Sequence, residues 1–328
     1  MILRPGTFLQ DRYEILEQIG SGGMSVVYKA KCHKLNRLVA IKVLKEEFCN
    51  DSNFVSKFKM EAQSAAGLSH PNIVSVYDVI DEGKLHYIVM ELIEGITLKS
   101  YIQKKGRLEI KETIGIAIQV AQGIAAAHEQ HIIHRDIKPD NLMVSKEGQF
   151  KLGDFGIARE PISGTMTVAG TPDYMAPEVK ETTIYDKTAD IYSLGLVLYY
   201  LSNDFRLPFA DVADPEERIN RRMKKDAVLP EPENAFADMR KLILKACAYD
   251  PKDRYQSAGE MKKALENIQK HPYGLCPKCG KILVKKPGQY GAFVACTGYR
   301  KGNPDSCDYR MNLKKLMEQL NAGKEQNA

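Results

Sequence analysis

The sequence predicts an α+β protein in which a β-rich first part is followed by a larger helical part and a small cysteine-containing segment. Three observations support this class. Residues 13–92 contain short runs in which apolar and polar residues alternate, which is typical of strands. Residues 93–269 instead carry apolar residues at helical spacing. The residues after 270 contain four of the seven cysteines, and such a cluster requires its own explanation.

The individual elements follow from these patterns. Strands are expected at residues 13–19, 25–31, 37–44, 73–78 and 85–92. A helix is expected at 54–67, with a buried face made of Phe54, Val55, Phe58, Ala62 and Ala65. Further helices are expected at 98–105, 110–128, 186–201, 235–248 and 257–269, with a short amphipathic helix at 312–320. Residues 130–185 show little periodicity, and a long irregular segment inside a compact domain is usually functional.

Composition and charge narrow the class of protein further. With 328 residues, 44% of them hydrophobic and 27% charged, the chain can bury a sizeable core. It lacks an apolar run of about 18 residues and a secretory signal, so we expect a cytoplasmic protein without a membrane-spanning helix. The formal charge of +5 is unevenly distributed, because residues 271–328 contain ten basic and four acidic residues. The excess positive charge therefore lies in the tail.

A glycine-rich turn, Gly20-Ser21-Gly22-Gly23, joins the first two expected strands. Glycines allow a backbone to approach phosphates closely and leave N–H groups free to face them. Because a strand rather than a helix follows, the turn does not fit a dinucleotide-binding fold. Taken alone, the turn is better explained as an ordinary hairpin turn. Ser25 stands where a third glycine is common.

A lysine follows on the third expected strand, in Val39-Ala40-Ile41-Lys42. An ammonium group is a compact charge that suits a phosphate oxygen. A carboxylate would be needed to hold it, and Glu61 on the next expected helix can supply one. As isolated residues, Lys42 and Glu61 are better explained as two separate surface charges.

The irregular segment resolves this ambiguity. It contains His134-Arg135-Asp136-Ile137-Lys138-Pro139-Asp140-Asn141, then Asp154-Phe155-Gly156, then Ala176-Pro177-Glu178. Together with the glycine turn and Lys42, these stretches have the order and spacing of the protein-kinase signature set. From about residue 13 to 269 the chain resembles the eukaryotic-like (Hanks-type) Ser/Thr protein kinases of bacteria. The resemblance implies a two-lobed fold with an N-lobe at 13–92, a C-lobe at 93–269 and ATP between them.

The resemblance also implies roles for individual residues. Asp136 would accept the proton of the substrate hydroxyl, Lys138 would face the migrating phosphoryl group, and Lys42, paired with Glu61, would hold the α- and β-phosphates. Asn141 and Asp154 would bind Mg²⁺ or Mn²⁺ through oxygen. The hinge would offer backbone groups of Glu91 and Ile93 to adenine, with Met90 behind it. The implied ATP-binding set is Gly20, Ser21, Gly22, Gly23, Val27, Ala40, Lys42, Glu91 and Ile93.

Two further matches have structural roles in the resembling family. Arg254 is similar to the arginine that pairs with Glu178, and Asp190 is similar to the helix residue that holds the catalytic loop. Neither is expected to be catalytic.

Specificity for Ser and Thr is implied by Lys138 and by Thr171, which precedes Ala-Pro-Glu and is expected to hydrogen-bond Asp136 and Lys138.

The segment between Asp154 and Glu178 also contains Ser163, Thr165 and Thr167. Because Arg135 can receive a phosphate, we predict autophosphorylation at Thr165 or Thr167. The alternative is a merely polar loop.

The tail contains Cys276-Pro-Lys-Cys279, followed by Cys296 and Cys307. Four thiolates suit a tetrahedral structural Zn²⁺ site, which would supply folding energy to a segment too small for a core of its own. A redox pair or two disulfides is the rival interpretation. Residues 274–311 are similar to the zinc ribbons at the C-termini of bacterial type IA topoisomerases, although the last cysteine spacing is longer than usual. The resemblance implies binding of single-stranded DNA.

Basic and aromatic residues of this segment fit such a role. Cations would contact phosphates and aromatic rings would stack on bases; the candidates are Lys285, Lys286, Arg300, Lys301, Tyr290, Phe293 and Tyr299. Two alternatives stay open. The aromatic residues can be the core of the ribbon while the lysines solubilise it, or the ribbon can dock proteins.

The leading hypothesis is therefore an active Ser/Thr kinase acting on protein substrates. The opposing class is an adaptor that binds ATP without turning it over and acts through the ribbon. The presence of Lys42, Asp136 and Asp154 opposes this alternative, because a pseudokinase usually lacks one of them. A small-molecule kinase is a weaker rival, since Thr171 and Ala-Pro-Glu indicate a peptide site.

Overall fold

The computed structural model describes residues 3–155, 172–181, 186–271, 273–274, 276–279, 281–300 and 306–316. The chain divides into two compact units. One comprises Met1–Lys104 and Gln122–Asp190, and the other comprises Lys105–Ala121 and Ile191–Ala328. Among the described residues, no helix is both long and apolar enough to cross a lipid bilayer.

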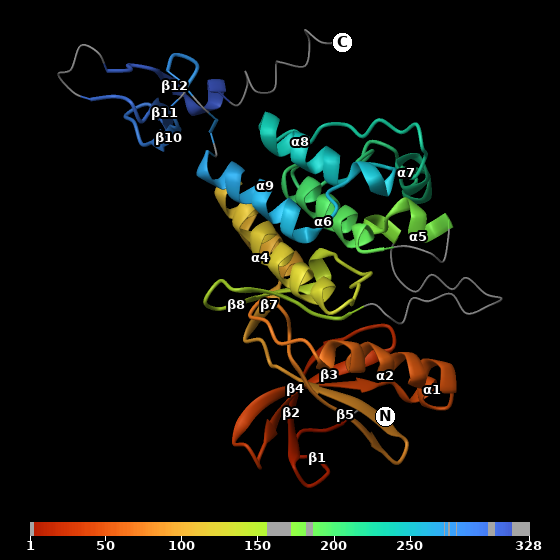
Figure 1. Cartoon of the computed structure of the whole chain (residues 1–328). Coiled ribbons are helices and arrows are strands. Elements are labelled where there is room, and N and C mark those ends of the chain that lie inside the picture. Colours follow the sequence, from red (N-terminus) through yellow and green to blue (C-terminus); the bar gives the residue numbers. More distant parts are fainter. Residues whose placement is uncertain are drawn as a thin grey trace. The chain divides into compact units, whose positions relative to one another are not determined.

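The first unit contains a six-stranded antiparallel sheet (Figure 1). Its strands, in spatial order, are β1 (Phe8–Leu9), β2 (Tyr13–Ser21), β3 (Ser25–Cys32), β4 (Arg37–Leu44), β6 (Leu85–Met90) and β5 (Val76–Glu82). Because paired residues lie on the same face of a sheet, Val27, Lys42 and Ile88 share one face. Tyr28, Ile41 and Val89 occupy the other face, in the main hydrophobic cluster of this sheet.

Helix α2 (Ser52–Ala66) covers part of the face that carries Lys42 (Figure 1). It follows the short helix α1 (Glu46–Cys49). Its N-cap is Asp51, whose carboxylate accepts a hydrogen bond from the Asn53 N–H. Its fully buried residues are Phe58, Ala62 and Ala65, so part of the expected apolar face is confirmed. The packing of this face positions Glu61, one residue before Ala62, next to the sheet.

The strand expected at 73–78 begins only at Val76. Ile73 instead forms a parallel bridge with Leu152, and the Val74 N–H donates to the Leu152 carbonyl at 2.9 Å. Residues 72–74 therefore pair with β9 (Phe150–Leu152), a strand from a distant part of the chain, before β5 joins the sheet. A local pattern cannot show this pairing.

A second antiparallel sheet lies within the first unit, with β7 (Gly95–Thr97), β8 (Leu142–Ser145) and β9 (Phe150–Leu152) in order. Strands β8 and β9 lie within residues 130–185, which show little periodicity in the sequence because strands of three or four residues are too short to establish a period. Gly95 is required here, since a Cβ atom would overlap the carbonyl group of Val144.

Five helices agree with the expected ones. They are α3 (Leu98–Lys105), α4 (Ile110–Glu129), α6 (Thr188–Leu201), α8 (Ala237–Ala246) and α9 (Ala258–Lys270). Helices α5 (Pro177–Glu181) and α7 (Pro215–Arg222) were not expected, and neither was α1. Helix α7 is mostly charged and has little apolar pattern. Its N-terminus nevertheless has two residues typical of a helix start: the N-cap Asp214, which accepts a hydrogen bond from the Glu216 N–H, and Pro215 in the first turn.

The cysteine-containing segment forms a three-stranded antiparallel sheet of β10 (Leu283–Lys286), β11 (Phe293–Cys296) and β12 (Arg310–Asn312). A small cluster that includes Tyr273, Leu283, Val294 and Leu316 covers it. Asn312 ends β12, and residues 313–316 are helical. The rest of the helix expected at 312–320 lies outside the described residues.

Candidate active site

Lys42, Glu61 and Asp154 meet in the first unit. The Lys42 Nζ atom donates to Glu61 Oε1 at 2.9 Å and to Asp154 Oδ1 at 2.8 Å. The side chains of Lys42 and Glu61 are only 12% and 13% exposed, whereas that of Asp154 is 53% exposed. The pairing of Lys42 with Glu61, left open by the sequence alone, is present. Lys42 lies on β4, Glu61 lies on α2, and Asp154 follows β9.

The electrostatics of this group favour a charged lysine. Burial alone would lower the pKa of Lys42, but the carboxylates of Asp154 and Glu61 outweigh it and raise that pKa. The same ammonium group lowers the pKa of Asp154. Lys42 and Asp154 are therefore both charged near neutral pH. The site presents a fixed cation beside an anion that faces outward.

Asp136, Lys138 and Asn141 form a second group in the same unit. The Asn141 amide donates to Asp136 Oδ2 at 2.9 Å and to the Asp136 carbonyl at 2.8 Å. Lys138 Nζ lies 2.9 Å from the same Asp136 Oδ2, in side chains that are 20% and 14% exposed. Because the amide nitrogen of Asn141 is used in this way, the amide oxygen is the atom of this side chain that can act as an acceptor elsewhere.

The backbone that carries Asp136 is held by two buried residues. Asp190 on α6 accepts the N–H groups of His134 and Arg135, each at 2.8 Å, so its expected role is confirmed. Burial alone would raise the pKa of Asp190, but the hydrogen bond and charge of His128 outweigh it and lower that pKa. His128 was missed, because a histidine near a helix end carries no distinctive pattern.

His134 connects this loop to the segment before Asp154. Its Nε2–H donates to the Gly153 carbonyl at 2.9 Å, while Nδ1 accepts the Asp136 N–H at 3.2 Å. Burial lowers the pKa of His134 and keeps the ring neutral, as both bonds require.

Arg135 and Asp154 have positive φ angles of 69° and 52°. Such strain at non-glycine residues, about 1–3 kcal/mol each, is found preferentially at functional sites.

The expected nucleotide-binding residues gather on the same side of the sheet. In the register of the sheet, Gly20 on β2 lies opposite Val27 on β3, and Val27 lies opposite Lys42 on β4. Ala40 on β4 lies opposite Met90 on β6. The Gly22 N–H donates to the Ser25 carbonyl at 2.8 Å, and Lys45 Nζ donates to the Gly23 carbonyl at 2.8 Å. Glu91 and Ile93 follow β6. The Glu91 N–H already donates to the Ser75 carbonyl at 2.8 Å, so its own carbonyl is the group to consider for adenine.

Four residues with expected roles lie outside the described part of the chain: Ser163, Thr165, Thr167 and Thr171. Arg254 is 1% exposed and donates to the carbonyls of Ala248 and Tyr249, while its pairing with Glu178 stays a prediction.

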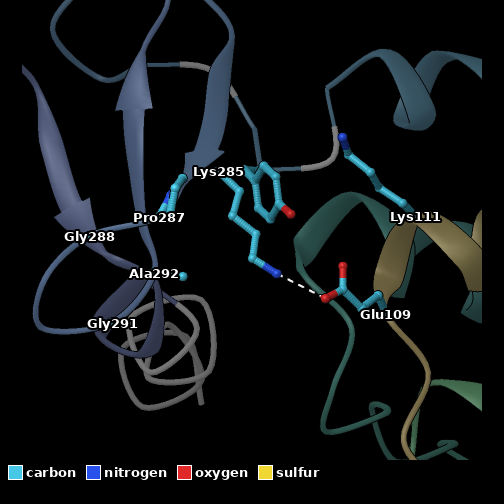
Figure 2. Close-up of a pocket in the computed structure, with 8 residues that line it drawn as sticks. Glu109, Lys111, Lys285, Pro287, Gly288, Gly291 and Ala292 are labelled. Atoms are coloured by element: carbon cyan, nitrogen blue, oxygen red, sulfur yellow. Dashed lines mark hydrogen bonds and ion pairs between the residues drawn. The ribbon is translucent and has the colours of Figure 1, made fainter. Parts of the chain in front are cut away.

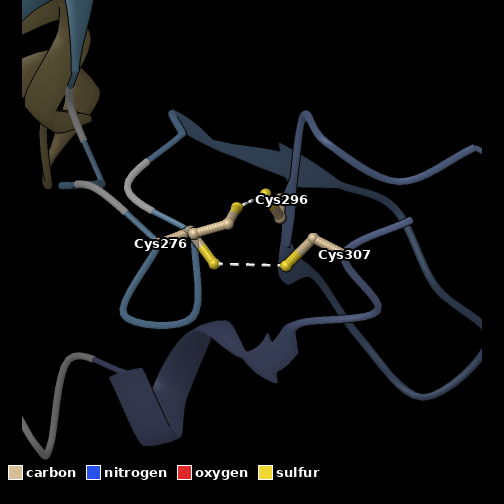
Figure 3. Close-up of side chains that lie close together, drawn as sticks. Cys276, Cys296 and Cys307 are labelled. Carbon is tan, nitrogen blue, oxygen red and sulfur yellow. Dashed lines mark hydrogen bonds between the residues drawn. The ribbon is translucent and has the colours of Figure 1, made fainter. Parts of the chain in front are cut away.

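The four tail cysteines converge (Figure 3). All four Sγ atoms lie within 4.8 Å of one another. The Cys276–Cys307 and Cys279–Cys296 sulfur distances are 3.5 and 3.3 Å, which is too long for the roughly 2.05 Å of a disulfide. All four are free thiols, and the Gly298 N–H donates to Cys296 Sγ at 3.2 Å. The arrangement fits a metal better than two disulfides.

The sequence patterns also gave no role to Lys151, a buried charged residue of the first unit. Lys151 on β9 is 9% exposed and pairs with Glu91. The available signal was a single lysine inside the short apolar run Phe150-Lys151-Leu152, since lysine is rarely buried unless it is paired.

Comparisons with known proteins agree with this geometry. The family model of the protein kinase domain matches residues 13–273. The chain is 42% identical to the serine/threonine-protein kinase PrkC of Bacillus subtilis, covering 80% of this chain and 41% of that protein. It is 38% identical to the serine/threonine-protein kinase PknB of Mycobacterium tuberculosis, covering 84% of this chain and 45% of that protein. The chain thus spans less than half of either relative.

Solved structures agree as well. The crystal structure of the PknI kinase domain of Mycobacterium tuberculosis superimposes with a TM-score of 0.65 at 26% identity, covering 82% of this chain and all of that one. The match to the family model ends at residue 273, before the four cysteines.

Proposed function

Because this chain belongs to the protein kinase family, we propose that it transfers the γ-phosphoryl group of ATP to Ser and Thr hydroxyl groups of proteins. The observation that carries the proposal is the meeting of Lys42 with Glu61 and Asp154, since Lys42 and Asp154 are 112 residues apart in sequence. A buried, doubly paired lysine beside an exposed carboxylate is the arrangement that phosphate and a metal ion require.

The glycine turn supports a nucleotide site. A Cβ atom at Gly20 or Gly22 would meet nothing closer than 3.7 Å, and one at Gly23 would meet nothing within 4 Å. Packing inside the protein therefore does not require glycine at these positions. We infer that Gly20, Ser21, Gly22 and Gly23 lie over the phosphates, where a bare backbone allows close approach.

The remaining nucleotide contacts follow from the sheet. Val27 and Ala40 would contact the base from the face that also carries Lys42. The carbonyl of Glu91 and the N–H of Ile93 would bind its edge.

The donor set also fits a hard cation. Asn141 has its amide nitrogen committed to Asp136, which leaves the amide oxygen to a metal, and Asp154 presents an exposed carboxylate. Asn141 and Asp154 would hold Mg²⁺ or Mn²⁺, which neutralises phosphate charge when bound.

The chain's own residues would perform the rest of the transfer. The Asp136 carboxylate would orient the substrate hydroxyl and accept its proton. Lys138 would stabilise negative charge on the migrating group, and Lys42 would hold the α- and β-phosphates.

Incubation with Mg-ATP and a basic protein substrate tests the proposal. We expect phosphoserine and phosphothreonine without phosphotyrosine. Mass spectrometry of the chain should find phosphate on Thr165 or Thr167, where Arg135 would pair with it. If ATP binds but no protein is phosphorylated, the adaptor alternative is correct. If substrate is phosphorylated while both threonines stay unmodified, only the autophosphorylation sites are wrong.

For the cysteine segment we propose a structural zinc ribbon. Four sulfurs at about 2.3 Å from one tetrahedral ion lie about 3.8 Å apart, close to the distances between the thiols. The Gly298 N–H bond to Cys296 would stabilise a thiolate at that position. Zinc thiolates fit the reducing cytoplasm expected for this protein.

We further propose that this ribbon binds single-stranded DNA. Tyr290 is 90% exposed and Tyr299 is 53% exposed, so both rings are available for stacking. Lys286 and Arg300 are also exposed. Lys285 is a weaker candidate, because Figure 2 shows its ammonium group directed at Glu109, with the Nζ–Oε1 distance at 2.9 Å.

Not every aromatic or basic candidate is available. Phe293 is partly buried and packs against Gly288, where an added Cβ atom would lie 3.0 Å from its ring. Lys301 lies outside the described residues.

A salt series with a labelled oligothymidine tests DNA binding. We expect salt-sensitive binding, and a loss of roughly tenfold or more for Tyr290→Ala, since stacking on one base is worth about 1–3 kcal/mol. Tyr77→Ala, which removes another exposed tyrosine outside the ribbon, serves as the matched control. Absence of binding at low salt, or equal binding by both variants, would favour a protein-docking or purely structural ribbon.

A further inference from the structure

We propose that Lys151 is a positioning residue for the adenine site, acting through the carboxylate of Glu91. This inference rests on the proposed function, because it assigns the Glu91 carbonyl to the nucleotide base. Nothing in the protein-kinase motifs of the sequence marks Lys151. The proposal comes from the contacts of this side chain and from its place on β9, three residues before Asp154.

The ion pair of Lys151 with Glu91 involves both carboxylate oxygens. Lys151 Nζ lies 2.9 Å from Oε1 and 3.1 Å from Oε2 of Glu91. The two side chains are 11% and 23% exposed. Solvent therefore screens the interaction weakly, and the ammonium group holds the whole carboxylate in one orientation.

Glu91 is held at its backbone and side chain together. Its N–H donates to the Ser75 carbonyl at 2.8 Å, and its Oε2 accepts the Ser75 N–H at 3.1 Å. The N–H group and both carboxylate oxygens of Glu91 are therefore all engaged by Ser75 or Lys151. The orientation of the peptide carbonyl that would accept the adenine amino group is thereby restricted before a nucleotide arrives, which lowers the entropic cost of binding.

The same contacts connect the base site to the metal site. Leu152, next to Lys151, receives the Val74 N–H and donates to the Asn72 carbonyl, each at 2.9 Å. The Gly153 N–H donates to the carbonyl of Asn141 at 3.0 Å. A change in how Lys151 holds Glu91 therefore acts on the short strand that leads to Asp154.

This arrangement has a consequence for base selectivity. A fixed carbonyl accepts the amino group of adenine but faces the carbonyl oxygen of guanine, and two acceptors repel each other. A carbonyl that is free to turn away tolerates guanine better. Lys151 should therefore contribute to rejection of GTP more than to catalysis itself.

Steady-state kinetics of Lys151→Met with ATP and GTP tests the proposal. We expect the KM for ATP to rise about tenfold with kcat changed less than about threefold, because ground-state positioning is lost. The preference for ATP over GTP in kcat/KM should fall about tenfold. Lys146→Met is the matched control: Lys146 pairs with Glu94 at 2.8 Å, but these side chains are 69% and 56% exposed. That variant should resemble the wild type, as exposed pairs contribute little.

The outcomes separate a positioning role from a structural one. If Lys151→Met lowers the thermal midpoint but keeps the wild-type KM and nucleotide preference, the proposal is wrong. Should this variant not fold, Lys151→Gln, which can still donate to Glu91, is measured instead, with a smaller loss of preference expected. If the wild type transfers no phosphoryl group, the proposed function fails by itself. Calorimetric binding of ADP and GDP then still reports whether Lys151 sets base preference.

Discussion

Replacement of Asp136 by Asn is expected to lower kcat by about 10²–10⁴-fold while ATP still binds. The carboxylate is the group to which we assign acceptance of the hydroxyl proton, and an amide cannot accept it. The surrounding contacts change little, because Asn141 can still donate to an oxygen at this position and Lys138 keeps partial access to solvent. The measurement is single-turnover phosphorylation of a protein substrate at saturating Mg-ATP.

Asp140→Asn is the matched control for this prediction. Asp140 lies in the same loop, but its side chain is 46% exposed and pairs with Lys99 at 2.9 Å. The same chemical change there should alter kcat by less than about twofold, since exposed ion pairs are worth little. A thermal unfolding curve for each variant shows whether the fold is kept. An Asp136→Asn enzyme with more than about a tenth of the wild-type rate would contradict the role assigned to this carboxylate.

Removal of the metal is expected to unfold the cysteine segment while leaving the rest of the chain folded. A structural zinc site supplies about 10–16 kcal/mol of apparent binding free energy at neutral pH. The cluster around Val294 and Leu283 is too small to replace that amount. Hydrogen exchange of the amides of β10 and β11, with and without a strong chelator, measures the effect. Elemental analysis of the purified protein should give about one zinc per chain.

Cysteine variants sharpen this experiment. Cys296→Ser removes a buried member of the cluster and should reduce both the zinc content and the amide protection. Cys49→Ser is the control, because Cys49 lies outside the cluster and its thiol donates to the carbonyls of Leu44 and Lys45. A metal-free protein whose β10 and β11 amides stay protected would show that the segment folds without zinc. Disulfides found by mass mapping would support the rival interpretation instead.

Part of the candidate active site could be predicted from the sequence, because its residues lie in short contiguous motifs. Asp136, Lys138 and Asn141 lie within six residues, in a stretch that carries the resemblance to protein kinases. That resemblance implied that they act together, and the structure brings them into contact. The five expected helices after residue 93 could also be predicted, because apolar residues recur in them at helical spacing, although α6 proves to be buried on nearly all sides. Residues 142–152 could not, since their strands are too short to establish a period.

The family, the class of fold and the residues assigned to catalysis all follow from the amino-acid sequence. Which distant groups pair became clear from the folded structure. Lys42 reaches Asp154 across 112 residues, Lys151 reaches Glu91 across 60, and Ile73 lies against Leu152 instead of opening a strand. The physical reason is that period and spacing report local backbone geometry. Contacts between distant segments depend instead on how whole elements pack and on which buried charges must find a partner.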